Sequence, residues 1–515
     1  MKQFEKVEVR KPRTNVFDLS HEKKLSCGIG ELIPIYLQEV IPGDMFKVNT
    51  ELLIRLAPLV FPLQHRVNAY VHYFFVPNRL LWKNWENFIT GGKDGDDISV
   101  HPYVMYNDTR KSYYERGSLA DYLGIPTTDG VNISAGQAIK LNALPFKAYN
   151  QIYNDFYRDP NLEDEINIYE GVDGEATGFY SSGMVLRTRC WEKDYFTSAL
   201  PWAQRGDAVE MPIEGHLHPV YSPTSTAKQF DGTPSLDGAI SISGQNLRDS
   251  QPSNIRILNL ADPQTVDFEG IEINDLRTAL RLQEWLEKNA RGGWRYVEQM
   301  LSHFGVVSKD ARLQRAEYLG GGKQPIVISE VLATADTGSY DVGQYAGHGI
   351  SVGKSNGFKK YFTEHGWIMG ILSVVPRSAY YQGVPRKFRK VDKFDYYWPE
   401  FAHLGEQEVL QEEIYFDPAG SDVGHTFGYQ ERYSEYKWEL DTVHGDYRTT
   451  GYENYHMGRK FSSAPALNST FVHIDKAGTD RVFQVTTQSV DKLYVQLYNR
   501  VKAIRPIPYF STPRL

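Results

Sequence analysis

The sequence predicts an all-β core with added helices, in which long loops separate the strands. Runs with the two-residue alternation of half-buried strands occur near both ends of the 515-residue chain. Its 34 Tyr and 25 Phe favour strands, and its 43 Gly and 26 Pro favour turns and long loops. A sheet that pairs early strands with late ones around long connections is typical of jelly rolls, so we expect that architecture.

The expected strands can be placed by their patterns. In residues 46–56 and 67–75 apolar side chains alternate with others, as in half-buried strands. Residues 367–375 are continuously apolar, which predicts a strand buried on both faces. Residues 429–439 alternate aromatic with charged side chains and continue the strand-rich last third. Residues 493–503 place their apolar side chains largely on one face.

Three segments have helical periodicity instead. Residues 79–90 and 146–159 repeat large apolar side chains at helical spacing. The strongest signal covers residues 273–293, which begin with a capping asparagine and end with two glycines, and we expect a continuation through 296–305. We expect loops at residues 91–145, 160–182 and 323–360.

Composition divides the chain into four regions. Residues 1–30 form an extended arm, and residues 31–206 the first part of the jelly roll with loop and helical insertions. Residues 207–270 are rich in Ser, Thr, Gly, Pro and Asp, which predicts an insertion on the surface. Residues 271–515 form a helix, the second part of the jelly roll and a C-terminal tail.

The net charge of −8 argues against a protein that coats nucleic acid by charge alone, so any such contact must be local. Only Cys27 and Cys190 occur, which predicts no disulfide framework, no thiolate metal cluster and a free-thiol cytoplasmic origin. The first residues lack the apolar stretch of a signal peptide. No apolar run is long enough to predict a membrane span.

The stretch YLGGGKQP, residues 318–325, resembles a phosphate-binding loop but lacks its pattern. That loop needs a glycine five positions before the final Gly-Lys pair and a Ser or Thr after it. Glu317 and Gln324 stand at those two positions. We interpret the three glycines as a flexible connection or as a place where two backbones approach closely.

The sequence contains no catalytic constellation. His216 and His218 offer a metal pair of the cupin kind, but no third ligand is evident nearby. Glu364 beside His365 suits a hydrogen-bonded strand end better than an acid–base pair. We therefore predict no metal and no cofactor, and a structural or assembly protein rather than an enzyme.

Several long stretches resemble the major capsid proteins of the Microviridae, specifically the gokushovirus group. They include the segments beginning PIYLQEVIPGDMFKVN at residue 34 and RTRCWEKDYFTSALPWAQRG at residue 187, and FTEHGWIMGILSVVPRSAYYQGV at residue 362. The stretches ARGGWRYVEQMLSHFGVVSKDARLQRAEYLGGG, FGYQERYSEYK and KAIRPIPYF follow the same family order.

This resemblance implies an eight-stranded antiparallel jelly roll with long insertions, whose copies form a small icosahedral shell with one subunit per symmetry-unique position. The shell would enclose a circular single-stranded DNA genome of a bacteriophage, together with a small basic DNA-binding protein. The chain would assemble in the host bacterial cytoplasm and reside in the virion. The insertion at 207–270 would project at the threefold axes and meet a host surface receptor.

Three sets of candidate contact residues follow. Basic side chains of the arm and tail could meet DNA; they are Lys2, Lys6, Arg10, Lys11, Arg13, Arg500, Lys502 and Arg505. A solvated terminus is the alternative for the arm. Aromatic segments could pack between subunits or in the core; their members are Trp82, Trp85, Tyr396, Tyr397 and Trp398. Host-contact candidates in the insertion are His216, His218, Tyr221 and Phe230.

Two other classes of protein stay open at this point. A cupin-like or carbohydrate-active jelly-roll enzyme would be a monomer or small oligomer with a metal or a sugar cleft. A receptor-binding spike module would form trimers and no closed shell.

Overall fold

The computed structural model describes residues 13–92, 96–129, 138–169, 173–206, 273–292, 314–332, 345–354, 357–417, 420 and 424–510. The chain divides into two compact units, residues 1–203 with 307–515, and residues 204–306. The described part of the second unit is mainly the helix α6 (Ile273–Gly292), as its periodicity predicted. The expected continuation through 296–305 and the insertion at 207–270 lie outside the described residues.

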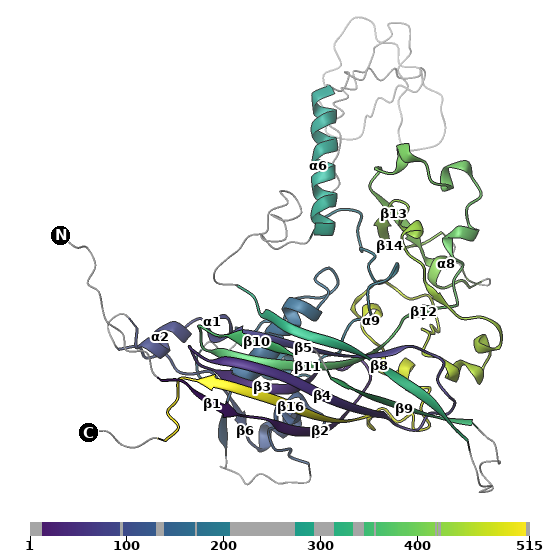
Figure 1. The fold of residues 1–515 in the computed structure, drawn as a ribbon. Helices are drawn as coiled ribbons and strands as arrows, with labels where there is room; N and C mark the ends of the chain where they lie inside the picture. Colours follow the sequence, from purple (N-terminus) through teal and green to yellow (C-terminus); the bar gives the residue numbers. More distant parts are fainter. Residues whose placement is uncertain are drawn as a thin grey trace, which may run out of the picture. The chain divides into compact units, whose positions relative to one another are not determined.

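The first unit is built on a strongly curled, mostly antiparallel sheet (Figure 1). Its strands are β1 (Asn15–Asp18), β2 (His21–Cys27), β3 (Ile33–Val40), β4 (Met45–Leu56), β5 (Val67–Pro77), β8 (Glu317–Leu332), β9 (Tyr345–Lys354), β10 (Phe358–Tyr361), β11 (Gly366–Pro376) and β16 (Leu493–Arg505). The order is β1-β16-β4-β9-β8-β5-β11-β3, with β2 also on β16 and β10 also on β4. Early and late strands therefore pair directly, as the sequence predicted.

Two halves of this sheet face each other across one core. One half contains β2, β16, β4 and β9, and the other contains β8, β5, β11 and β3. The long strand β8 joins them, because its first part pairs with β5 and its last part with β9. Side chains from both halves share one cluster of buried residues, including Ile54 of β4, Ile368 of β11 and Val501 of β16. Burial of this inner face supplies most of the driving force for folding.

A buried polar contact also links the halves. The hydroxyl groups of Thr50 on β4 and Tyr73 on β5 are hydrogen-bonded, and the Thr50 hydroxyl donates to the Asn499 side-chain oxygen at 2.6 Å. The Asn499 amide in turn donates to the Ile35 carbonyl oxygen of β3 at 3.3 Å. Each of these three side chains has a partner, so they do not carry the penalty of unmade hydrogen bonds.

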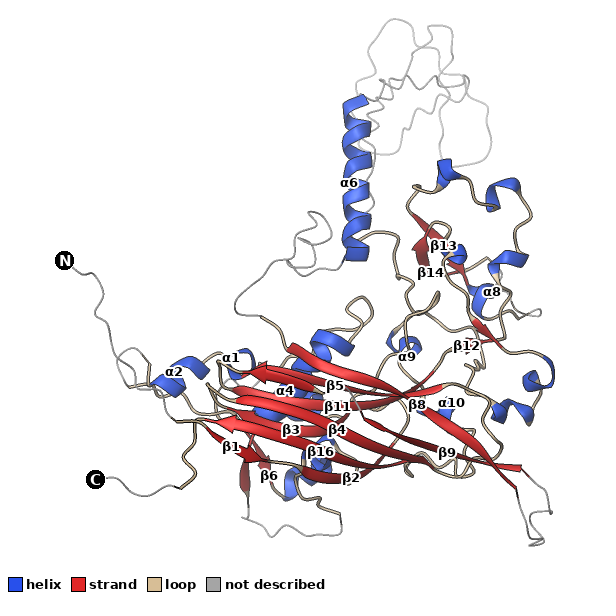
Figure 2. Cartoon of the chain, in the orientation of Figure 1, coloured by secondary structure: helices blue, strands red, loops and turns tan. Residues whose placement is uncertain are grey.

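Helices cover the outer face of the β5–β11 half (Figure 2). They are α1 (Asn78–Leu81), α3 (Leu119–Leu123), α4 (Leu144–Ile152), continued by a π-helical turn at Tyr153–Tyr157, and α5 (Phe179–Gly183). Helix α2 (Trp85–Thr90) follows α1 and has no buried residue. Phe74, Met369 and Ile371 on that face share a second buried cluster with Phe146 of α4. Both faces of β5 and β11 are therefore buried, which confirms the prediction made for residues 367–375.

The remaining elements are short. They are the strands β6 (Tyr103–Tyr106), β7 (Ile139–Asn142), β12 (Ala379–Tyr380), β13 (Glu406–Leu410), β14 (Thr426–Glu431) and β15 (Asp441–Thr442), and the helices α8 (Gln411–Ile414), α9 (Ser469–Val472) and α10 (Lys476–Asp480). A third buried cluster, which includes Phe196, Val409 and Phe471, organises much of the region between β11 and β16.

The structure corrects or completes several sequence predictions. Nearly all the described residues of the segment 323–360, expected as loop, lie in β8, β9 and β10, because their backbones pair with strands far away in sequence. The glycines of YLGGG lie in β8, and a side chain at Gly321 would overlap the Val71 carbonyl oxygen. Close backbone approach, one of the two interpretations, is therefore correct. Strand β14 ends at Glu431, because Tyr433 adopts a left-handed conformation with φ 63° and turns the chain.

Candidate contact surfaces

An exposed aromatic segment lies in the region between β11 and β14. Its large side chains have exposed fractions from 46% for Trp398 to 92% for Val391; they are Phe388, Val391, Phe394, Tyr396, Tyr397 and Trp398, called here the aromatic segment. Three short 3-10 turns, at Arg386–Phe388, Lys393–Asp395 and Pro399–Phe401, shape its backbone. So many large apolar groups exposed in one segment are typical of a protein–protein contact.

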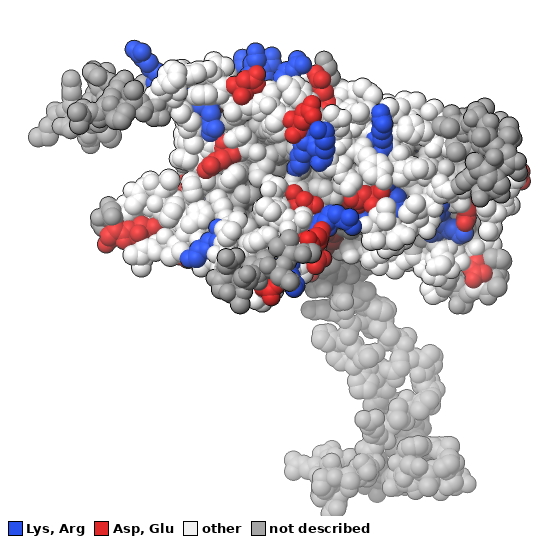
Figure 3. Space-filling model, turned by 90° about the horizontal axis from the view of Figure 1, so that it is seen from below, with Lys and Arg blue, Asp and Glu red and all other residues white. Residues whose placement is uncertain are grey.

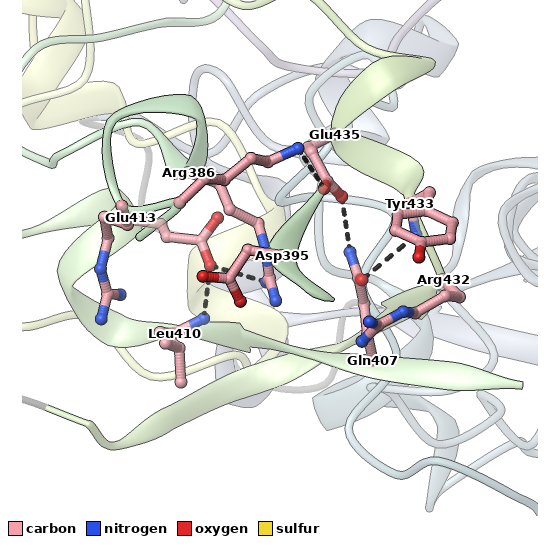
Figure 4. Close-up of a pocket in the computed structure, with 10 residues that line it drawn as sticks. Arg386, Asp395, Gln407, Leu410, Glu413, Arg432, Tyr433 and Glu435 are labelled. Carbon is pink, nitrogen blue, oxygen red and sulfur yellow. Dashed lines mark hydrogen bonds and ion pairs between the residues drawn. The ribbon is translucent and has the colours of Figure 1, made fainter. Parts of the chain in front are cut away.

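Ion pairs hold the beginning of this segment to the region behind it (Figure 4). The guanidinium of Arg386 lies 3.1 Å from Glu413, and that of Arg389 lies 2.9 Å from Glu412. Both carboxylates are almost fully buried. Burial raises the pKa of Glu413, although Arg386 acts in the opposite direction.

Lys390 and Glu435 form the most deeply buried of these pairs. Their charged atoms are 3.0 Å apart, and their side chains are 7% and 11% exposed. Gln407 also donates to Glu435 at 2.8 Å, and the Lys390 ammonium lies 3.7 Å from the centre of the Tyr436 ring. Burial alone would raise the pKa of Glu435, but the hydrogen bonds from Gln407 and Lys390 outweigh it and lower the pKa below its ordinary value.

Tyr433 completes the anchor. Its hydroxyl donates to the Tyr396 carbonyl oxygen at 3.2 Å and accepts from the Trp398 backbone N–H at 3.3 Å. Its ring packs edge-on against Tyr397 with ring centres 5.0 Å apart. The aromatic segment is thus exposed but fixed, which lowers the entropy cost of docking against a partner.

The predicted aromatic contacts separate in the structure. Tyr396, Tyr397 and Trp398 are about half exposed. Trp82 is buried, its indole N–H donates to Asp173 at 2.9 Å, and Trp85 packs edge-on against it. Trp82 is therefore a core residue, which was the alternative interpretation for these aromatic side chains. We do not propose Trp82 as a subunit contact.

A second candidate surface is the outer face of β16, β4 and β10. Lys502 on β16 lies directly opposite Lys47 on β4, and Lys47 lies opposite Lys359 on β10. All three are exposed. Like charges opposite one another on neighbouring strands repel, so this row is more stable when an anion lies over it.

Acidic groups limit the charge of this face. Asp18 on β1 lies opposite Lys502, and Glu51 lies 3.2 Å from Arg500. Figure 3 likewise shows Lys and Arg interspersed with Asp and Glu on the side that it presents. A nucleic-acid contact here must be local, as the net charge predicted.

The other predicted DNA contacts have different environments. Arg505 is largely buried and pairs with the fully buried Asp44 at 3.0 Å, so its charge is already compensated. Arg13 is exposed, whereas Lys2, Lys6, Arg10 and Lys11 lie outside the described residues.

The host-contact candidates His216, His218, Tyr221 and Phe230 also lie outside the described residues. Sequence reasoning missed the anchoring ion pairs, although the basic run at residues 386–390 is a visible signal.

These features define the class of this protein as a subunit of a larger assembly. A curled two-layer β scaffold with an anchored, exposed aromatic segment suits a subunit that packs against other chains. Within the described residues, no helix is long and apolar enough to cross a membrane.

The comparisons identify the family within that class. Residues 6–515 match the family described as "Capsid protein (F protein)". The chain is 34% identical to the "Capsid protein VP1" of Chlamydia phage 1, over 99% of this chain and 97% of that protein. It is 34% identical to the "Capsid protein VP1" of Bdellovibrio phage phiMH2K, over 96% and 94% of the two chains. The corresponding protein of Spiroplasma virus 4 is 30% identical over 98% and 95%.

The chain belongs to this family of phage capsid proteins. It is therefore a major capsid protein of a bacteriophage, a structural component of the virion and not an enzyme. The resemblance to gokushovirus capsid proteins is confirmed, and neither the enzyme nor the spike module is favoured.

Proposed function

We propose that copies of this chain assemble through the aromatic segment into a small closed icosahedral shell around a circular single-stranded DNA genome. The observation that carries this proposal is the combination of exposure and anchoring in that segment. A subunit contact needs apolar and aromatic area at its centre, and that area binds best when it is already ordered.

The proposed building block is an eight-stranded jelly roll. Numbering the main strands β2, β3, β4, β5, β8, β9, β11 and β16 from one to eight, one half has the order 1-8-3-6 and the other 5-4-7-2. Such interleaving of early and late strands in two antiparallel layers supports a jelly roll with two Greek keys. In this interpretation β1 extends the first strand and β10 extends the sixth.

The proposed DNA contact is the row Lys502, Lys47 and Lys359 with the neighbouring Arg500. Lysine and arginine side chains bind phosphate without reading sequence, and an exposed Tyr494 on the same face of β16 offers a ring for base stacking. A small basic virion protein would supply further charge, which allows this chain to remain acidic. Residues 207–270 remain our proposal for the region that meets a host receptor, and assembly in the host cytoplasm remains a proposal.

The first experiment is negative-stain electron microscopy and light scattering of the purified chain. We expect closed particles of uniform small diameter. Replacing Tyr396 and Trp398 together by Ala should prevent closure while leaving the subunit folded, because both side chains are already half exposed. Each truncation should cost about 1–2 kcal/mol per contact.

The matched control is Tyr452→Ala, because Tyr452 is 52% exposed but lies outside the aromatic segment. Closed particles from the double variant would show that the aromatic segment is not the contact. Wild-type chains that stay monomeric even with single-stranded DNA and the basic virion protein present would contradict assembly itself.

A further inference from the structure

Glu163, Cys190 and His473 meet in a partly buried cluster away from the surfaces described above. Each offers one ligand atom, and the three atoms lie within 4.8 Å of one another. Cys190 and His473 form an isolated antiparallel bridge. The Trp191 N–H donates to the Val472 carbonyl oxygen at 2.9 Å, so the backbone holds the two side chains together.

The imidazole of His473 lies between the carboxylate and the thiol. Its Nε2 is 2.6 Å from Glu163 Oε1, and its Nδ1 is 4.0 Å from Cys190 Sγ. Bonds of about 2.0–2.3 Å place neighbouring ligand atoms of a tetrahedral Zn²⁺ about 3.3–3.8 Å apart. One ring nitrogen of His473 lies within 4.8 Å of both the Glu163 oxygen and the Cys190 sulfur, so side-chain shifts of about an ångström would bring one ligand atom from each residue onto a single ion.

Further polar groups surround the cluster in the positions that usually orient metal ligands. The Tyr153 hydroxyl donates to Glu163 Oε2 at 2.6 Å. The Thr188 hydroxyl lies 3.1 Å from His473 Nδ1, and the Tyr157 carbonyl oxygen lies 3.5 Å from Cys190 Sγ. Such outer contacts fix the rotamers of a ligand set and raise its affinity.

The cluster also needs a positive charge. A buried carboxylate facing a ring nitrogen is costly unless a proton or a metal ion lies between them. A proton or a divalent cation can supply that charge.

We propose that Glu163, Cys190 and His473 bind a thiophilic divalent cation of the Zn²⁺ type. Sulfur, imidazole nitrogen and one carboxylate oxygen form a ligand set that suits zinc, whereas Ca²⁺ and Mg²⁺ prefer oxygen alone. The ion joins segments that are far apart in the sequence and locks the helical layer to the segment after α9. Binding releases protons, so the affinity rises with pH.

Co²⁺ is the probe, added to the full-length chain under reducing conditions, because a thiolate bound to Co²⁺ gives a charge-transfer band in the near ultraviolet. The chain has only two cysteines, and Cys27 is fully buried. We expect the band in the wild-type chain at pH 8, its loss in Cys190→Ser, and a weaker band at pH 6. A wild-type chain with no band, or a band that survives in Cys190→Ser, would overturn the proposal.

Zn²⁺ and thermal unfolding provide an independent readout. We expect Zn²⁺ to raise the unfolding temperature of the wild-type chain and of the control His444→Gln, in which an exposed histidine outside the cluster is changed. The same ion should leave the unfolding temperature of Cys190→Ser and Glu163→Gln unchanged. An equal rise in all four chains would show non-specific binding and overturn the site.

Discussion

Lys390→Met tests whether the buried ion pair anchors the aromatic segment. The substitution keeps the length of the side chain but leaves Glu435, only 11% exposed, without its ammonium partner. Breaking a buried pair from one side costs about 3–5 kcal/mol. The remaining hydrogen bond from Gln407 offsets part of this, so we expect a loss of about 2–3 kcal/mol in the free energy of unfolding.

The assay is urea unfolding of unassembled subunits, combined with light scattering during assembly. We expect Lys390→Met to lower the unfolding midpoint and to slow particle formation. The matched control is the double variant Lys390→Met with Glu435→Gln, which removes both charges and should recover most of the lost stability. A single variant as stable as the wild type, or a double variant no better than the single one, would refute the anchoring role.

Three further predictions concern other parts of the chain. Gly321→Ala should cost about 2 kcal/mol, because its Cβ would overlap the Val71 carbonyl oxygen, and urea unfolding that matches the wild type would contradict this packing. Hydrogen bonds with Cys190 and Glu163 raise the pKa of His473 to about 10, so with EDTA present its positive charge should stabilise the fold fully below pH 6.5. This contribution, up to about 4 kcal/mol, should be lost as the pH rises through 10. The stability of His473→Gln should depend less on pH, and equal curves for the variant and the wild type would exclude the effect. Arg500→Gln and Lys502→Gln should each weaken binding of a single-stranded oligonucleotide and reduce the slope of log binding constant against log salt concentration by about 0.7. The control Lys111→Gln, outside this face, should leave that slope unchanged. Unchanged slopes in all three variants would show that the DNA contact lies elsewhere.

The sequence by itself predicted the strands that carry the core. Strands β4 and β16 have one face on the core and one on solvent, so their apolar side chains alternate with polar ones. Strands β5 and β11 are buried on both faces, so most of their side chains are apolar. The helices α4 and α6 were visible for the same reason, at their own period. Each of these patterns is local, so no knowledge of the partner strand is required.

Strands β8, β9 and β10 depend on distant partners. Their glycines and polar side chains carry little periodicity, and their backbones are ordered by pairing with β5 and β4. In residues 429–439 the sequence predicted a strand that is longer than the one observed. The alternating pattern continues to residue 439, but β14 ends at Glu431 because Tyr433 turns the chain toward the aromatic segment. Backbone pairing and a single left-handed residue are decided by tertiary context.

The sequence predicted the contact surfaces only in part. The sequence correctly indicated that Tyr396, Tyr397 and Trp398 form an unusual aromatic run, but it could not separate them from the buried Trp82. Exposure depends on what the rest of the chain covers. The anchoring pair of Lys390 with Glu435 and the cluster of Glu163, Cys190 and His473 join residues that are distant in sequence. Their chemistry arises only when folding brings their charges and ligand atoms within bonding distance.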